Sequence, residues 1–180
     1  MSMSWEMEYK KRLKTADEAL GCVKSGMRVY IQPGCAEPET LVEALIRRAP
    51  ELFDVEIVHM MTMGCAPYVA PEMAGHFRHN AMFIGANVRD AINEGRADYT
   101  PIYLSEIEGL FESGQMPIDV ALIEVSPPDS HGFCSFGVGV DTTLTAARVA
   151  KHVVAQVNDN MPRTYGDSFI HVDDISAFVE

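Results

Sequence analysis

The sequence has 180 residues, of which 47% are hydrophobic and 22% are charged, values typical of one globular domain with a sizeable core. Fourteen lysines and arginines oppose 26 aspartates and glutamates, so the net charge is −12. Because an acidic surface repels phosphate groups, this charge argues against nucleic acid and anionic membranes as partners. No apolar segment approaches the ~20 residues that span a bilayer.

The amino-terminal end and the cysteines indicate the compartment. Charged residues of both signs occupy positions 6–12, without the apolar region that a secretory signal carries. The cysteines lie far apart and include no C-x-x-C pair: Cys22, Cys35, Cys65 and Cys134. This spacing favours free thiols in a reducing compartment over a disulfide framework or a zinc site. We therefore expect a cytoplasmic protein without a bound metal.

Helical and strand patterns alternate along the whole chain. Helices are expected at 6–20, 38–48, 88–95, 104–112 and 142–151. Strands are expected at 27–31, 54–60, 81–84, 98–103, 118–125, 152–157 and 169–172. Residues 61–80 have no clear period and predict a functional loop or short helical turns. Because parallel strands need helical crossovers, we predict an α/β fold with a mainly parallel, Rossmann-like sheet and helices on both faces.

One strand–loop–helix unit is the clearest of these. Residues 120–125 are almost all apolar, as in a strand that is buried on both faces. Pro127 and Pro128 cannot donate to a sheet ladder, so they end this strand. The segment Ser126–Gly132 is then a loop at the carboxyl end of a strand, where open α/β sheets bind ligands. A helix capped by Asp141 follows.

The loop after the first strand supplies further candidates. Gly34 precedes a helix, but Glu37 and Glu39 in the expected first turn would repel an anion, which favours a tight turn over a phosphate cradle. The Gln32 amide and the backbone N–H groups of Gly34 and Cys35 could line a pocket for an acyl group or a carbonyl oxygen. No base stands near Cys35 in the sequence, so packing is a more economical role for it than nucleophilic attack.

Histidines and other polar residues follow several strands. His76 and His79 would share one face of a helical turn, but no third metal ligand accompanies them, so a surface or capping role is expected. His131 has two alternatives, a role in a site or a hydrogen bond to Asp129 that fixes the turn. Three further residues could orient a carboxylate or a thioester carbonyl, or could simply close turns: Asn87, Asn158 and Arg163.

Three long segments resemble the acetyl-CoA hydrolase/transferase family. They are FIGANVRDAINEGRADYTPIYLSEI at 83–107, DVALIEVSPPDSHGFCSFGVGVD at 119–141 and VNDNMPRTYGDS at 157–168. The resemblance covers essentially the whole chain after its first few residues. It is strongest to the members that transfer CoA among 4-hydroxybutyrate, butyrate and acetate.

The resemblance implies a longer enzyme with two related α/β halves, of which residues 1–180 are the N-terminal domain. The glutamate that forms a covalent glutamyl-CoA thioester, and most of the CoA-binding surface, would lie in the C-terminal half. No residue of this chain is therefore assigned as catalytic, and the chain alone is expected to be inactive. The implied substrates are an acyl-CoA thioester and a small carboxylic acid, with no permanently bound cofactor. The implied partners are the C-terminal half and, in the complete enzyme, further copies in a homo-oligomer.

In this interpretation the N-terminal half shapes a pocket for the acyl group and the carboxylic acid. The residues expected to bind substrate are Gln32, Gly34, Cys35, Thr62, Gly64, Asn87, Ser126, His131, Gly132, Asn158 and Arg163. Two alternatives stay open, an acyl-CoA hydrolase and a non-catalytic half that docks a partner domain. A sugar-phosphate isomerase-like relative is disfavoured, because every lysine lies on a predicted helix, a turn or the edge of one.

Overall fold

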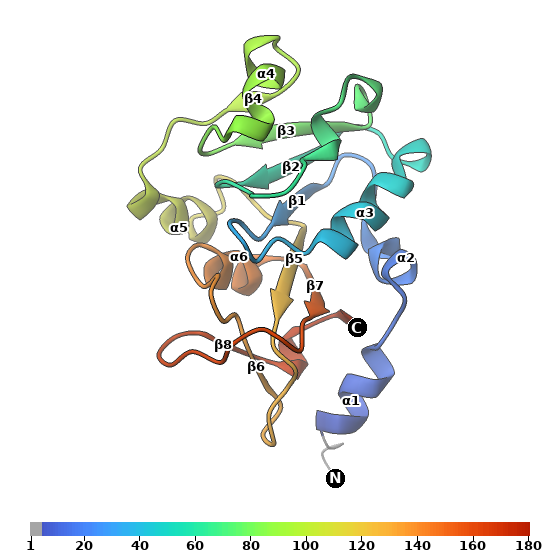
Figure 1. Cartoon of the computed structure of the whole chain (residues 1–180), viewed down its shortest axis with the longest axis vertical. Coiled ribbons are helices and arrows are strands. Elements are labelled where there is room, and N and C mark those ends of the chain that lie inside the picture. Colours follow the sequence, from blue (N-terminus) through green and yellow to red (C-terminus); the bar gives the residue numbers. More distant parts are fainter. Residues whose placement is uncertain (1–4) are drawn as a thin grey trace.

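The computed structural model describes residues 5–180 and centres on a seven-stranded sheet (Figure 1). In spatial order the strands are β4 (Asp98–Tyr99), β3 (Phe77–Ala81), β2 (Val55–His59), β1 (Arg28–Ile31), β5 (Val120–Val125), β7 (His152–Val157) and β9 (Ala177–Val179). All neighbouring strands in this sheet run parallel. The predicted α/β class with a mainly parallel sheet is confirmed.

The direction in which strands are added reverses between β1 and β5. The chain proceeds outward from β1 through β2 and β3 to β4, and then returns to place β5 on the other side of β1. The loops that leave the carboxyl ends of β1 and β5 therefore lead away from each other. In open α/β sheets, a crevice opens at such a point and ligands bind there.

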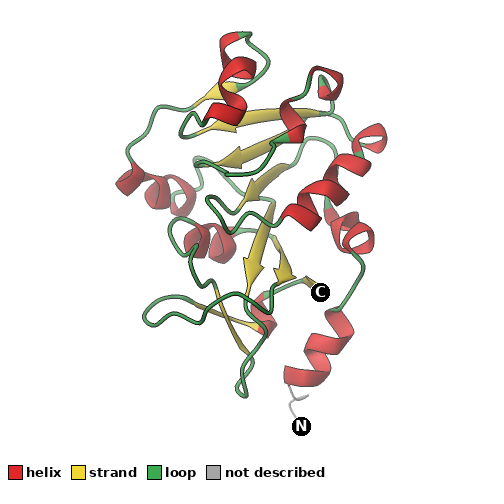
Figure 2. Ribbon diagram, viewed as in Figure 1, coloured by secondary structure: helices red, strands yellow, loops and turns green. Residues whose placement is uncertain are grey.

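Helices cover both faces of the sheet (Figure 2). On one face lie α2 (Ala16–Ala19), α3 (Glu39–Arg47) and α4 (Ala86–Asn93), and on the other lie α1 (Trp5–Arg12), α5 (Leu104–Glu112) and α6 (Thr143–Val149). Five short 3-10 helices complete the helical structure: η1 (Leu20–Cys22), η2 (Ala49–Glu51), η3 (Pro67–Val69), η4 (Pro71–Met73) and η5 (Val172–Asp174). No helix in residues 5–180 is long and apolar enough to cross a membrane.

The central strands supply both core layers. In β1, Ile31 points into the layer beneath α3, whereas Tyr30 points into the layer beneath α5 and α6. Leu122 and Ile123 divide in the same way, and all six residues of β5 are buried. Burying one such side chain contributes about 1.5–3 kcal/mol to the stability of the fold. Because its side chains enter both layers, β5 stabilises both of them.

Both edges of the sheet are short. At one edge, β4 has two residues and is followed by Pro101. At the other, the chain at Leu13 forms a parallel bridge with Phe178 of β9, and the Lys14 N–H donates to the Phe178 carbonyl at 2.9 Å. The segment that links α1 to α2 therefore covers the outer side of β9.

The predicted helix at 6–20 is in fact two helices. Thr15 stands between them and forms a capping box, in which its hydroxyl accepts the Glu18 N–H and the Glu18 carboxylate accepts the Thr15 N–H. A capping box starts a helix, so the chain cannot continue α1 unbroken through Thr15. The helix predicted at 142–151 is α6 (Thr143–Val149), whose N-cap position is Thr142. Asp141 lies just before it, and its carboxylate accepts the Thr143 N–H at 3.1 Å.

The third strand was predicted in the wrong place. It was expected at 81–84, but β3 runs from Phe77 to Ala81. The next two residues lie outside the strand, although the Met82 and Phe83 N–H groups still donate to the carbonyls of His59 and Met60. Arg78, His79 and Asn80 make this strand look irregular in sequence. His79 is therefore on a strand, and it does not share a helical turn with His76. The stretch before β3 contains the short helical turns η3 and η4.

Two strands were missed and one was too long in the prediction. A separate antiparallel pair joins β6 (Phe133–Ser135) to β8 (Phe169–His171), and β9 lies within the acidic C-terminal segment. The fourth strand, expected at 98–103, has only the two residues of β4. Pairing partners that lie more than twenty residues away in the chain create β6 and β9, so local patterns in sequence do not show them.

Candidate functional site

The loops that leave β1 and β2 stay side by side beyond the sheet. The Gly34 N–H donates to the Met61 carbonyl at 2.6 Å, and the Met63 N–H donates to the Gly34 carbonyl at 3.3 Å. Gly34 and Thr62 thereby form an isolated parallel bridge. Gly34 has a φ of +72°, which a residue with a Cβ rarely adopts. Two predicted site residues from separate loops therefore meet next to the switch point of the sheet.

Asn87, at the start of α4, holds the second of these loops. Its side-chain nitrogen donates to the Gly64 carbonyl at 2.8 Å and to the Thr62 hydroxyl at 3.2 Å. Of its two expected roles, closing a turn is therefore the one that these contacts supply. The network gives Thr62 and Gly64 a defined position relative to the helix.

Glu37 is the main partner of Gly64. Its carboxylate accepts the Gly64 N–H at 2.9 Å, and it packs so closely on Gly64 that a Cβ there would collide with it. Glu37 was expected in the first turn of a helix, but α3 begins at Glu39 and Glu37 lies before it. Burial raises the pKa of Glu37, while hydrogen bonds from Gly64 and Thr62 act to lower it.

A hollow of about 400 Å³ opens between these loops and the ends of β5 and β7. This volume lies in the range of small-ligand sites. Four predicted site residues line it: Gly34, Cys35, Gly64 and Asn158. Three carboxylates also line it, from Glu37, Glu39 and Glu124, and its lining within residues 5–180 includes no lysine or arginine.

Glu124 is a buried carboxylate near the end of β5. It accepts a hydrogen bond from the Gln156 side-chain amide at 2.9 Å, and the oxygen of that amide accepts the Thr40 N–H at 3.0 Å. Burial raises the pKa of Glu124, and hydrogen bonds from Asn158 and Gln156 oppose that shift. Sequence reasoning missed Glu124, although a single glutamate within the apolar run VALIEV was a sign of it.

Gln32 has no exposed surface and is used inside the protein. Its side-chain nitrogen donates to the Gly139 carbonyl at 2.9 Å, and its side-chain oxygen accepts the Glu124 N–H. A Cβ at Gly139 would collide with Gln32 and Ala36. Gln32 therefore joins β1, β5 and the segment before α6, and because it has no exposed surface its amide does not line the hollow.

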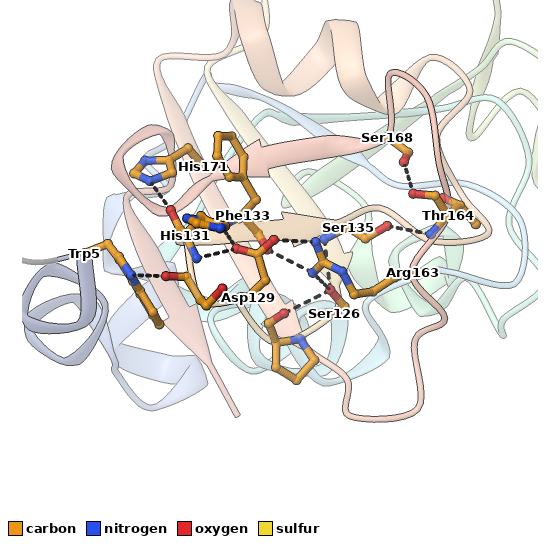
Figure 3. Close-up of polar contacts among 12 residues, drawn as sticks. Trp5, Ser126, Asp129, His131, Phe133, Ser135, Arg163, Thr164, Ser168 and His171 are labelled. Atoms are coloured by element: carbon orange, nitrogen blue, oxygen red, sulfur yellow. Dashed lines mark hydrogen bonds and ion pairs between the residues drawn. The ribbon is translucent and has the colours of Figure 1, made fainter.

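The other predicted residues belong to the turn before β6 (Figure 3). One Asp129 oxygen accepts the backbone N–H groups of His131 and Phe133 at 2.8 and 3.0 Å. The other accepts a bond from the Arg163 guanidinium at 2.8 Å, and Arg163 also donates to the Phe133 carbonyl and to the Ser126 hydroxyl. Desolvation acts to raise the pKa of Asp129, but these N–H groups and the Arg163 charge lower it overall.

Gly132 is a packing position in this turn. It has a φ of +83°, and a Cβ would collide with His171 and with Trp5 of α1. Trp5 donates from its indole nitrogen to the Ser130 carbonyl at 3.1 Å, which fixes α1 against the turn. The His131 side chain is exposed, and the bonds at this residue use its backbone atoms.

The predicted site residues thus form two groups. Around the hollow lie Gly34, Cys35, Thr62, Gly64, Asn87 and Asn158, with Gln32 beneath them. Around the turn before β6 lie Ser126, His131, Gly132 and Arg163. The groups adjoin at the ends of β5 and β7, where the Asn158 N–H donates to the Val125 carbonyl at 2.9 Å.

A family model described as the acetyl-CoA hydrolase/transferase N-terminal domain matches residues 1–180. The chain belongs to this family. The resemblance seen in the sequence is therefore confirmed over its full extent.

Relatives in the acetyl-CoA hydrolase/transferase family include known CoA-transferases. The 4-hydroxybutyrate coenzyme A transferase of Clostridium kluyveri is 51% identical over 178 residues, which cover 99% of this chain and 42% of that protein. The butyryl-CoA:acetate CoA-transferase of Anaerostipes caccae is 36% identical over 183 residues, covering 99% and 41%. The crystal structure of 4-hydroxybutyrate CoA-transferase from Porphyromonas gingivalis superposes with a TM-score of 0.82 at 33% identity, covering 98% and 41%. The chain spans about two fifths of the length of these relatives.

Proposed function

We propose that this chain is the substrate-pocket half of an acyl-CoA:carboxylate CoA-transferase of the 4-hydroxybutyrate or acetate/butyrate type. The proposal depends chiefly on the contact of Gly34 with Thr62 beside the switch point of the sheet, with Gly64 on the same loop as Thr62, in a member of the acetyl-CoA hydrolase/transferase family. A hollow of about 400 Å³ suits a short acyl group or a small carboxylic acid.

The reaction would proceed through a glutamate of the C-terminal half. Its carboxylate attacks the thioester carbonyl of acyl-CoA, which releases CoA thiolate and leaves an acyl-glutamyl anhydride. The thiolate then attacks the glutamyl carbonyl, releases the first carboxylate and forms the glutamyl-CoA thioester. A second carboxylate takes the CoA by the reverse steps. No residue of this chain forms a covalent bond in the scheme.

The residues of this chain would bind and orient the acid. Gly34 and Gly64 bring backbone close to the hollow, and Asn87 and Glu37 keep that backbone in place. A carboxylate substrate entering beside Glu37 and Glu124 would meet negative charge. Because burial raises the pKa of both groups, they accept protons more readily than ordinary glutamates, and a protonated carboxyl donates a hydrogen bond to a carboxylate. The CoA phosphates would bind cations outside this hollow.

Transfer to water would make the same enzyme a hydrolase. A closed site that excludes water favours the carboxylate acceptor. The relatives named above are transferases, which supports the same choice here.

The test uses the complete protein that contains this sequence. Butyryl-CoA and acetate should give acetyl-CoA, with free CoA released far more slowly. Incubation with acyl-CoA alone, followed by peptide mass mapping, should find a CoA adduct on a glutamate outside residues 1–180. An adduct within residues 1–180, or hydrolysis in place of transfer, would contradict the proposal.

A further inference from the structure

Two histidines lie stacked below the loop that leaves β2. His59 is the last residue of β2, His79 lies in β3, and each is only 1% exposed. Their ring centroids are 4.2 Å apart and the rings are inclined by 23°. The Tyr68 hydroxyl lies 2.6 Å from Nε2 of His59, and the Ile57 carbonyl lies 3.1 Å from Nδ1 of His79. The pair was not recognised in the sequence, because its two members belong to different strands.

Each ring keeps one nitrogen without a partner. A carbonyl oxygen only accepts, so Nδ1 of His79 carries the proton and Nε2 is a free acceptor. Nε2 of His79 and Nδ1 of His59 have no hydrogen-bond partner in residues 5–180. Buried polar atoms are rarely left unpaired in folded proteins, and an exception calls for an explanation.

A proton on either ring would be poorly stabilised. Burial lowers the pKa of His59 far below its usual value, and the neighbouring His79 lowers it further. Burial also lowers the pKa of His79, to about 4, although the Ile57 carbonyl and the charge of Asp98 act in the opposite direction. Both imidazoles are therefore neutral near pH 7.

The remaining ionisable groups around the pair do not supply a partner. The Tyr68 phenol is buried and its pKa is raised, by burial first and by the charge of Glu37 second, so it stays neutral. Glu37 bonds to Gly64, and Asp98 pairs with Arg78 at a half-exposed position. A second proton in the cluster would thus lie beside an imidazole and a phenol, with both nearby carboxylates already engaged.

Tyr68 connects this pair to the candidate site. Besides His59, its hydroxyl has the Thr62 side chain as a hydrogen-bond partner. His59 precedes Thr62 by three residues and Tyr68 follows it by six, so their contact closes the base of the loop that carries Thr62 and Gly64. Asn87 and Glu37 hold the outer part of the same loop.

We propose that the contact of Tyr68 with His59, supported by the stacked His79, is a positioning device that keeps Thr62–Gly64 in its binding geometry only while both imidazoles are neutral. The inference rests on the proposed function, because that function places the substrate acid at this loop. In the tautomer of His59 that carries its proton on Nδ1, Nε2 accepts the Tyr68 hydroxyl. A second proton, added to Nε2, turns it into a donor, so this bond has to break or reverse. The loop then loses the closure at its base.

Hydrogen–deuterium exchange of the purified chain tests the positioning directly. Tyr68→Phe removes only the hydroxyl, and Tyr99→Phe, at a half-exposed tyrosine, is the matched control. At pH 7.5 we expect residues 60–66 to exchange roughly tenfold faster in Tyr68→Phe than in the wild type, with β5 still protected. The control should match the wild type. Unchanged exchange of this loop in folded Tyr68→Phe would overturn the inference.

Hydrogen–deuterium exchange of the wild-type chain at a series of pH values tests the same inference without a substitution. After correction for the intrinsic exchange rate, protection of residues 60–66 should fall further than protection of β5 as the pH is lowered from 6.5 toward 4, the pKa to which burial lowers His79. Equal loss in both segments, or no loss in the loop, would show that the histidines are only core packing.

The link to the site is read in the complete protein. There Tyr68→Phe should raise KM for the carboxylate about tenfold with little change in kcat. An unchanged KM would overturn the link. A wild-type protein without transferase activity would contradict the proposed function instead, while the exchange results, which need no substrate, would stand.

Discussion

The loops around the hollow and the turn before β6 both combine glycine with polar residues but use their polar groups differently. Both follow a strand at the carboxyl edge of the sheet, and both contain a glycine that has no room for a Cβ. In the turn, Asp129 and Arg163 bond to each other and to the surrounding backbone. At the hollow, Glu37 and Asn87 hold a loop from the side, and Cys35 remains exposed. Glycines and polar residues after a strand thus predict a loop, but not whether its polar groups remain available for a ligand.

The distinction between a substrate-binding hollow and a structural turn does not hold if a residue of this chain is itself the nucleophile. We expect the isolated 180-residue protein to transfer no CoA from butyryl-CoA to acetate above the uncatalysed rate. The reason is that the proposed scheme places the attacking glutamate in the C-terminal half of the complete protein. A turnover on the order of 10 per second, ordinary for an enzyme, would show instead that a residue in 1–180 reacts. The complete protein, assayed in parallel, is the positive control.

The two buried histidines should make the stability of the protein depend on pH. His59 and His79 have folded pKa values below the unfolded value of about 6.5, so the unfolded chain binds more protons as the pH falls. Their stabilising contribution is complete above about pH 6.5 and is lost as the pH falls toward 4. For His79 alone, the difference between 6.5 and about 4 corresponds to roughly 3 kcal/mol.

Urea unfolding at pH 7, 6 and 5 measures this loss. His79→Phe should flatten the dependence, whereas His152→Asn, at an exposed histidine, should leave it unchanged. Glu37 and Glu124 have raised pKa values and act in the opposite direction, as the pH falls through those values toward 4.5. A dependence that is equally steep in His79→Phe would show that the buried pair does not titrate as inferred.

Substitution of Gly64 and of Gly132 should affect different properties of the protein. In the complete protein, Gly64→Ala should lower kcat/KM by roughly tenfold to a hundredfold, because the added methyl displaces Glu37 and shifts the loop. Gly132→Ala should destabilise the protein by about 1–3 kcal/mol, because of its positive φ, and leave activity per folded molecule unchanged. Melting temperature and kcat/KM are measured on both variants. The reverse pattern would exchange the roles of the two regions.

His131 belongs to the turn before β6 through its backbone, but its side chain could still contact substrate. Its imidazole is exposed while its backbone fixes the turn, so the side chain is available for substrate. His131→Ala should therefore lower kcat/KM in the complete protein about tenfold, or about 1.4 kcal/mol, without a change in melting temperature. Full activity in this variant would show that the turn has only a structural role and that His131 does not contact substrate.

Sequence patterns predicted the parts of the fold that local chemistry determines. The helix at 104–112 and the strand at 152–157 have the predicted bounds, because each has a clear apolar pattern and clear stop signals. The strand β3 was misplaced because its polar residues find partners on neighbouring strands, such as Asp98 for Arg78. No local pattern contains that information.

In the candidate site, too, local sequence predicted some features, whereas others depend on distant partners. Loops at strand ends were correctly predicted, since the order of elements determines where they lie. Burial of Glu37 and Glu124 was not, because it depends on loops from several strands. Gln32 was expected to face a ligand, but its partner Gly139 is more than one hundred residues away in the chain.

The two edges of the sheet limit how further protein can join this domain. An exposed strand edge is a template for pairing and aggregation. Here β4 offers two residues before Pro101, which has no N–H, and the outer side of β9 is already bonded to Leu13 and Lys14. A second domain or subunit that paired with β9 would have to displace these native bonds, and one that paired with β4 would find only two residues. Both edges therefore favour assembly through side chains and loops, in which the fit between surfaces, and not generic backbone pairing, selects the partner.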